Sequence, residues 1–312
     1  MGFMIFFQQI IVLFLIGLAG FVARRKNILN KHANEVFTQL ILSLTLPFLI
    51  LYAMDQPSPS AWELVWLIPM SVFVLAFACI LAFYTRKKLQ IPNQTKSVFE
   101  GVIIFGNQGF IGYALILGLF PELGALYVTL FNLPYLILIW TYGVYLFIRN
   151  KSAIPWKNIF FNPGILATLL GLLIFLLPVR WPGLLSDAFQ LIGTMTIPLS
   201  MLVIGTFVAD MNLNASMLLS IVKNKILWFV TALRLLIIPI ILIPFYFVSV
   251  PFPILATAVL VSGTPSAPTV ALFAQKYGGD KKFAALVSFW TTLLTILTLP
   301  ILYILVYWMY AT

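Results

Sequence analysis

Charged residues are scarce in this chain of 312 residues, where 18 Lys and Arg and 8 Asp and Glu make up only 8%. Soluble domains carry about 25% charged residues. With 62% hydrophobic residues and a mean hydropathy of +1.08, too few polar side chains remain to cover a water-facing surface. The lack of charge excludes an ordinary soluble domain, and we expect the lipid bilayer to be the solvent.

Cysteine and histidine are almost absent, with Cys79 and His32 as the single examples. No disulfide framework or metal-binding spacing can be built from them. We expect Cys79 to be a small buried hydrophobe and His32 to be solvated in a basic loop. The chain also lacks a Ser/His/Asp set, HExxH, a Walker loop and GxGxxG. The sequence therefore predicts no enzyme, no catalytic residue, no metal and no cofactor.

Long continuous apolar runs replace the alternating pattern that a membrane β-barrel requires. A helix needs about 20 apolar residues to cross the hydrocarbon core, so the chain has room for roughly ten crossings. We predict an all-α polytopic membrane protein, with residues 1–312 forming a single transporter domain. The predicted spans are residues 3–23, 33–53, 62–84, 97–118, 123–148, 159–178, 186–209, 225–248, 252–275 and 282–309.

The basic residues lie on one side of this predicted topology. All except Arg180 and Arg234 fall in the loops that follow the first, third, fifth, seventh and ninth spans. Positively charged loops stay in the cytoplasm. This placement explains the net charge of +10 without nucleic acid, and it predicts a multi-pass protein of the cell membrane with both termini outside.

Two similar segments suggest an internal duplication. Residues 35–47 and 187–198 each contain an acid, a Phe and a closing Thr-Leu-Pro or Thr-Ile-Pro, at Pro47 and Pro198. An interruption of a span by Gly or Pro follows each segment, after about 60 residues. Because each half would hold an odd number of spans, the halves 1–150 and 158–312 are predicted to be inverted repeats.

The two interruptions are the candidate binding site. Paired breaks in corresponding spans of inverted halves point to a transporter site, and the N-terminus of each resulting half-helix favours an anion. Kinks without a ligand are the alternative. The candidate substrate-binding residues are Gly106, Asn107, Gln108 and Gly109 in the fourth span, and Thr264, Pro265, Ser266 and Pro268 in the ninth.

Two further polar side chains lie within predicted spans. Asn132 is in the fifth span, and Arg234 lies about 12 Å deep in the eighth if that span begins near Ile226. An intramembrane Arg is costly and suggests function, although Arg234 can also brace the broken helices or extend to the cytoplasmic face. We include both as substrate-binding candidates. All eight acids lie at or near span ends.

Several motifs resemble the auxin efflux carrier family. Gly106 to Ala114 is similar to its fourth-span motif, and Pro198 to Gly205 to its seventh. Arg234 to Pro239 is similar to the eighth, and the matches continue in the same order to the end of the chain. The remaining matches are Ser266 to Pro268, Ala274 to Asp280 and Thr291 to Pro300.

The resemblance implies ten spans in inverted repeats, with helices 4 and 9 broken and crossing, as in the bile acid symporter and sodium–proton antiporter folds. It also implies a homodimer, with spans 1, 2, 6 and 7 as scaffold. By position, Asn107 matches a substrate-contacting residue and Pro268 the crossover proline. The short loop 149–158 resembles the bacterial malate and malonate permease branch. Ala114 departs from the family, which has proline there.

We therefore predict a secondary carrier that moves a small organic anion, a mono- or dicarboxylate, by elevator-type alternating access. Because the sequence shows no buried carboxylate that could carry a proton or bind sodium, uniport driven by the membrane potential, or exchange, is favoured over symport. A cation/proton antiporter or sodium-coupled symporter is the alternative, and it needs an edge acid such as Glu100 or Asp210 to reach the cavity. A membrane receptor or assembly subunit with the same fold is the third possibility.

Overall fold

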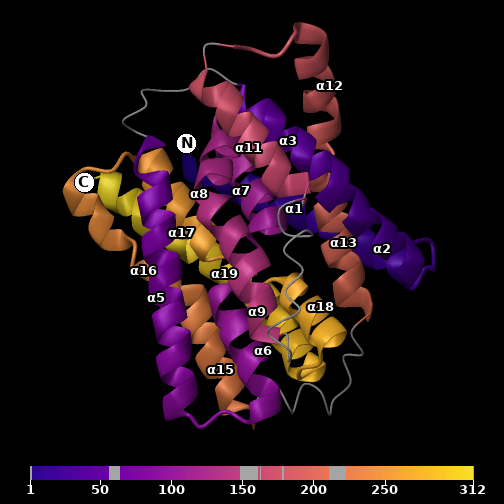
Figure 1. The fold of residues 1–312 in the computed structure, drawn as a ribbon, viewed down its shortest axis with the longest axis vertical. Coiled ribbons are helices and arrows are strands. Elements are labelled where there is room, and N and C mark those ends of the chain that lie inside the picture. The colour runs from indigo at the N-terminus through magenta and orange to yellow at the C-terminus, as the bar shows by residue number, and fades with distance from the viewer. Residues whose placement is uncertain are drawn as a thin grey trace. The chain divides into compact units, whose positions relative to one another are not determined.

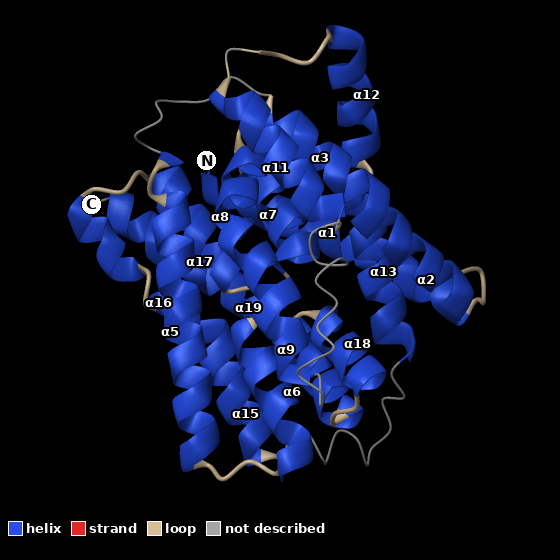
Figure 2. Ribbon diagram, in the orientation of Figure 1, coloured by secondary structure: helices blue, strands red, loops and turns tan. Residues whose placement is uncertain are grey.

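The computed structural model describes residues 2–55, 64–147, 161, 163–177, 179–210 and 223–311. Within these ranges the chain is helical and has no strand (Figure 2). One isolated antiparallel bridge joins Gly106 to Ser266. The prediction of an all-α protein is confirmed for the described residues. The loop 149–158 lies outside them.

Helices occur within every predicted span (Figure 1). They are α1 (Gly2–Arg25), α2 (Lys31–Leu40), η1 (Ile41–Thr45), α3 (Leu46–Met54), α5 (Leu67–Lys88), α6 (Asn93–Ile104), η2 (Gln108–Gly112), α7 (Tyr113–Leu119), α8 (Gly124–Leu138), η3 (Ile139–Gly143), α9 (Val144–Phe147), α11 (Pro163–Leu176), α12 (Gly183–Thr194), α13 (Thr196–Asp210), α15 (Lys225–Ala232), η5 (Leu233–Ile237), α16 (Ile238–Ile240), η6 (Ile243–Val248), α17 (Phe252–Ser262), α18 (Pro268–Tyr277) and α19 (Lys281–Ala311).

Six helical runs in the described part of the chain are long and apolar enough to cross a membrane. The count of ten crossings stays a prediction. The six runs are Lys31–Met54, Leu67–Lys88, Gly124–Phe147, Gly183–Asp210, Lys225–Val248 and Lys281–Ala311.

Two prolines within the long runs, Pro47 and Pro239, are preceded by widened π-helical turns. A proline ring clashes with the carbonyl four residues earlier in a regular α-helix. The π-helical η1 covers that position ahead of Pro47, and η5 covers it ahead of Pro239. Each run therefore continues through its proline as a helix.

The chain forms two compact units, which we describe separately. The first contains Met1–Ser60, Gly109–Leu130 and Trp156–Asn212; the second contains Ala61–Gln108, Phe131–Pro155 and Leu213–Thr312.

In the first unit, α1 packs along α13 at very short range. A Cβ on Gly205 would collide with the carbonyl oxygen of Gly17 and stand 2.7 Å from the Phe21 nitrogen. A Cβ on Gly20 would collide with the backbone of Leu202. Small residues at such contacts let membrane helices approach backbone to backbone.

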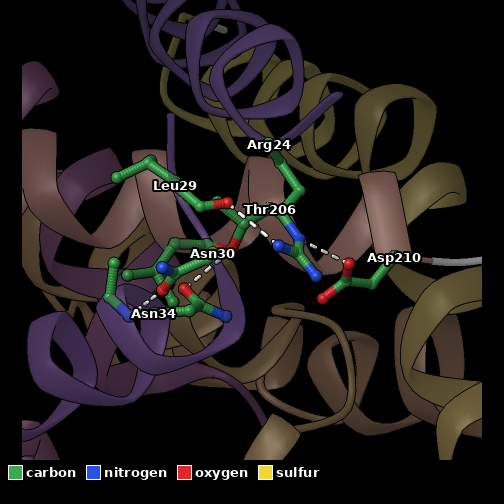
Figure 3. A network of polar contacts seen from close by, with 8 residues as sticks. Arg24, Leu29, Asn30, Asn34, Thr206 and Asp210 are labelled. Atoms are coloured by element: carbon green, nitrogen blue, oxygen red, sulfur yellow. Dashed lines mark hydrogen bonds and ion pairs between the residues drawn. The ribbon is translucent and has the colours of Figure 1, made fainter. Parts of the chain in front are cut away.

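A network of polar contacts links α1, α2 and α13 at one end of this helix pair (Figure 3). Arg24 donates from Nε to Asp210 at 2.5 Å and from Nη1 to the Leu29 carbonyl at 3.0 Å. Thr206 donates to the Asn34 side chain at 2.7 Å, and Asn30 caps α2. The start of α2 is thereby tied to the end of α13.

In the second unit, α6 is the central helix, and every residue from Val98 to Ile104 is buried. It contacts α5, α18, α19 and α15; Figure 1 shows α5, α15 and α6 running alongside one another. A helix buried on all sides is expected to be apolar all round, so its one acid, Glu100, is an exception that needs an explanation.

We predict that Gly205→Ala lowers the melting temperature of the detergent-solubilised protein. The new methyl group meets backbone atoms of α1, which cannot rotate aside, and overpacking of this kind costs about 1–3 kcal/mol. Gly183→Ala is the matched control, because a Cβ there meets nothing within 4 Å. Equal melting temperatures for the two variants would contradict the close α1–α13 packing.

Candidate substrate site

The two predicted interruptions meet within the second unit. The backbone of Phe105 is extended after α6, and that of Ala267 is extended before α18. The Asn107 N–H donates to the Pro265 carbonyl at 2.6 Å, and the Ala267 N–H donates to the Phe105 carbonyl at 2.9 Å. The backbone N–H and C=O groups that lose their helical partners at one break therefore form hydrogen bonds with the backbone at the other break. Burial in a membrane requires such pairing.

The side chains of Thr264 and Ser266 secure this junction. The Ser266 hydroxyl donates to the Val102 carbonyl at 2.8 Å, and the Ser266 N–H donates to the Thr291 hydroxyl at 3.1 Å. Thr264 donates to the Val261 carbonyl at 2.7 Å. Both hydroxyls thus bond the carbonyls of interrupted helices, and their predicted contact with substrate remains a prediction.

Arg234 lies at the centre of the same junction and is 1% exposed. Its Nε donates to the Thr264 carbonyl at 3.0 Å, and its Nη1 lies 3.2 Å from the Ile103 carbonyl and 3.4 Å from that of Ile104. It therefore bridges the C-terminal end of α6 and the backbone just beyond α17. Among the described residues it forms no ion pair.

Gly106 leaves the space that the Arg234 guanidinium occupies. A Cβ at that position would collide with Arg234 Nη2 and lie 2.7 Å from the Thr264 hydroxyl. The Gly106 carbonyl accepts a hydrogen bond from the Tyr135 hydroxyl at 2.7 Å. Glycine is thus needed here for close approach rather than for an unusual backbone angle.

Three buried amide side chains lie beside the junction, and none of them takes part in the hydrogen bonds that hold the two breaks together. Asn107 is 4% exposed, and Gln108 and Asn132 are each 2% exposed. Gln108 Oε1 and Asn132 Oδ1 have no hydrogen-bond partner among the described residues. Buried polar atoms without partners are costly, and a bound ligand would satisfy them.

Most of the predicted site residues are therefore brought together. Backbone or side-chain bonds join Gly106, Asn107, Thr264, Pro265, Ser266 and Arg234. Pro268 begins α18 directly after the junction. Asn132 lies three residues before Tyr135 on α8, hence on the same helix face. Gly109 belongs to the first unit, and a Cβ there would meet nothing within 4 Å.

Sequence reasoning missed Tyr135 and the contact of Thr291, and it named Glu100 only as an edge acid that a cation antiporter would need at the cavity. Tyr135 and Thr291 look like ordinary span residues, and only their hydrogen bonds to Gly106 and Ser266 single them out. Glu100 lies near a span end, as predicted, yet it is 1% exposed. The prediction that no carboxylate is buried was therefore wrong. Among the described residues, no group of three or more His, Cys, Asp or Glu is placed to hold a metal ion.

A family model described as membrane transport protein matches residues 5–303. The chain belongs to this family. The resemblance to the auxin efflux carriers is thereby confirmed, and the chain is a multi-pass membrane transport protein. An uncharacterized transporter of Methanocaldococcus jannaschii is 21% identical over 211 residues, which cover 65% of this chain and 68% of the relative.

For this transport protein we predict that Arg234→Met lowers the melting temperature more than Arg234→Lys. Methionine leaves buried carbonyls of α6 and of Thr264 without a donor, at about 1–3 kcal/mol for each unsatisfied group. Lysine retains a charge but loses the planar fork. Arg25→Met is the control, since Arg25 is exposed. A stable Arg234→Met protein that no longer binds anions would instead show that Arg234 contacts the substrate.

Proposed function

We propose that this protein is a secondary carrier that moves a small organic anion, a mono- or dicarboxylate, across the cell membrane. The observation that carries the proposal is the junction at Gly106 and Ser266, with buried amides beside a buried arginine. Amide side chains supply both donors and acceptors to a ligand. Arginine supplies a positive charge that forms no ion pair among the described residues.

The direction of the helices supports an anion rather than a cation. Arg234 occupies the C-terminal end of α6 and bonds Thr264 beyond the end of α17, where carbonyl oxygens concentrate negative potential. A substrate approaching from the other side of the junction meets the N-terminus of α18, where N–H groups favour negative charge. Asn107, Gln108, Asn132 and Pro268 are the residues that we assign to it.

The proposal includes ten spans in two inverted repeats, 1–150 and 158–312, with broken helices 4 and 9 crossing. It also includes a homodimer and elevator-type alternating access. The helices of predicted spans 1, 2, 6 and 7 fall in the first unit, which supports their role as the scaffold of an elevator. Residues Gly109–Leu130, from predicted spans 4 and 5, fall in that unit as well. The junction falls in the second unit, which would carry the substrate.

A flux experiment in proteoliposomes tests the proposal. Purified protein should exchange labelled malate, malonate or acetate against the same unlabelled anion, with saturation and without added ATP. Vesicles without protein are the control. Movement of Na⁺ or H⁺ with no carboxylate exchange would favour the cation antiporter, and no flux of either kind would favour a receptor or assembly subunit.

We predict that Asn107→Ala weakens substrate binding at least tenfold while the protein stays folded. The loss of one or two hydrogen bonds in a buried site corresponds to about 1–3 kcal/mol. The backbone bond from Asn107 to Pro265 does not depend on the side chain. Binding is measured by isothermal titration and folding by thermal melting. Gln190→Ala is the control, since it alters an exposed amide on α12. Wild-type affinity would remove Asn107 from the site.

Both termini are proposed to lie outside the cell, because the basic loops lie inside. We predict that a cysteine at 90–94 in a Cys79→Ser background is protected from an impermeant thiol reagent in intact cells. A cysteine at 56–60 should react. Permeabilised cells, in which both positions should react, are the control. The reverse pattern would invert the topology and the direction of both half-helices.

A further inference from the structure

Glu100 is a carboxylate buried in the central helix of the second unit. One oxygen lies 2.6 Å from Arg86 Nη1, at the end of α5, and the other accepts a hydrogen bond from the Tyr142 hydroxyl of η3 at 3.0 Å. Ionisable residues within a membrane are rare and suggest function by default.

The other elements packed on α6 bring few charges to this point. From η5, Arg234 bonds the carbonyls of Ile103 and Ile104 at the C-terminal end of α6. Asp280, just before α19, bonds Thr95 in the first turn of α6. Arg86 is therefore the one cation paired with Glu100 among the described residues.

A cleft of 570 Å³ lies within the same unit, and its lining comes within one helical turn of Glu100 without including it. Asn93, Gln94 and Ser97 of α6 line one side, and Leu146 and Phe147 of α9 line the other. Ser97 lies one helical turn before Glu100, and Leu146 lies one turn after Tyr142, which bonds Glu100. The residues that line the cleft and the Glu100–Tyr142 pair therefore lie on the same face of each of the two helices, one helical turn apart.

A pair of glycines borders the cleft at the start of α19. Gly278 has φ +85°, a backbone conformation that favours glycine, and a Cβ there would meet nothing within 4 Å. The Asp280 N–H donates to the Gln94 carbonyl at 3.2 Å, which attaches this segment to the first turn of α6. The border of the cleft is thus built from backbone, with no side chain at Gly278 or Gly279 to close it.

From this juxtaposition we infer that Glu100 takes up a proton from water in the cleft and releases it during the transport cycle, so that the carrier is a proton–anion symporter. The inference rests on the proposed function. Proton uptake forms one O–H bond on the carboxylate and removes its negative charge. Release to water on the other side of the membrane restores the carboxylate, and one proton has crossed.

The local contacts permit this change of charge. Arg86 is 24% exposed and lies beside Lys87 and Lys88 at the helix end, so it can return to water when Glu100 becomes neutral. Tyr142 can still donate to the remaining carbonyl oxygen. Desolvation offsets much of the Coulombic gain of a buried ion pair, which lowers the free-energy cost of neutralising Glu100 while Arg86 returns to water.

Electrostatics favours symport over antiport. The α6 helix runs from Glu100 to the junction, and Ile104 is about 6 Å further along its axis at 1.5 Å per residue. A negative charge on the helix that leads to the junction repels an anion bound there, because the membrane interior screens charge weakly. Protonation of Glu100 removes the repulsion, so anion and proton bind best together. Carried with a monoanion, the proton makes the transported charge zero.

The test measures uptake of labelled anion into proteoliposomes that are more acidic outside than inside. Wild-type protein should accumulate the anion. The Glu100→Gln protein should accumulate at least tenfold less labelled anion than the wild type. It should still exchange anion at equal pH, because glutamine resembles the protonated side chain. Asp210→Asn is the matched control, since Asp210 also pairs with an arginine and should keep accumulation.

Accumulation by Glu100→Gln under the pH gradient, or wild-type accumulation only under the reversed gradient, would overturn the inference. No exchange by wild-type protein would overturn the proposed function instead, and this inference with it.

A second variant covers the case in which Glu100→Gln does not fold. Tyr142→Phe keeps the carboxylate but removes a donor that stabilises its charged form, so half-maximal uptake should move to higher pH. An unchanged pH profile would also overturn the inference.

Discussion

The backbone pairing between Phe105–Asn107 and Pro265–Ala267 is the interaction on which the second unit depends. Two helices that stop inside a membrane release N–H and C=O groups that lipid cannot satisfy. Here the two breaks bond each other, and Arg234 donates to the carbonyls that are left over. This arrangement makes an interrupted backbone compatible with burial and keeps it at one place in the unit.

The same constraint explains why small residues cluster at the junction. Gly106 leaves room for the Arg234 guanidinium, and Ser266 reaches the Val102 carbonyl with a short side chain. Larger side chains would separate the breaks and expose the carbonyls. The buried amides beside the junction have no such structural duty, and this difference is what marks them as ligand contacts in the proposed carrier.

In the first unit, small residues allow two helices to pack closely, whereas in the second unit they make room for the junction. Helices α1 and α13 meet through Gly17, Gly20 and Gly205, and the ion pair of Arg24 with Asp210 joins their ends. Arg24 and Arg86 both pair with acids, yet Asp210 is 33% exposed and Glu100 only 1%. Burial beside a cleft therefore distinguishes Glu100 chemically from an ion pair that lies nearer to water.

The sequence by itself determined the solvent, the helical class, the family and the two interruptions. These follow from composition and from Gly and Pro, whose backbone effects are local. Only the tertiary structure decided the partners of Arg234, the bond from Tyr135 to Gly106 and the burial of Glu100. Such contacts join distant residues, with Arg234 and Ile103 separated by 131 positions. Glu100 lies near a basic helix end in sequence, but packing by α5 and η3 removes it from water.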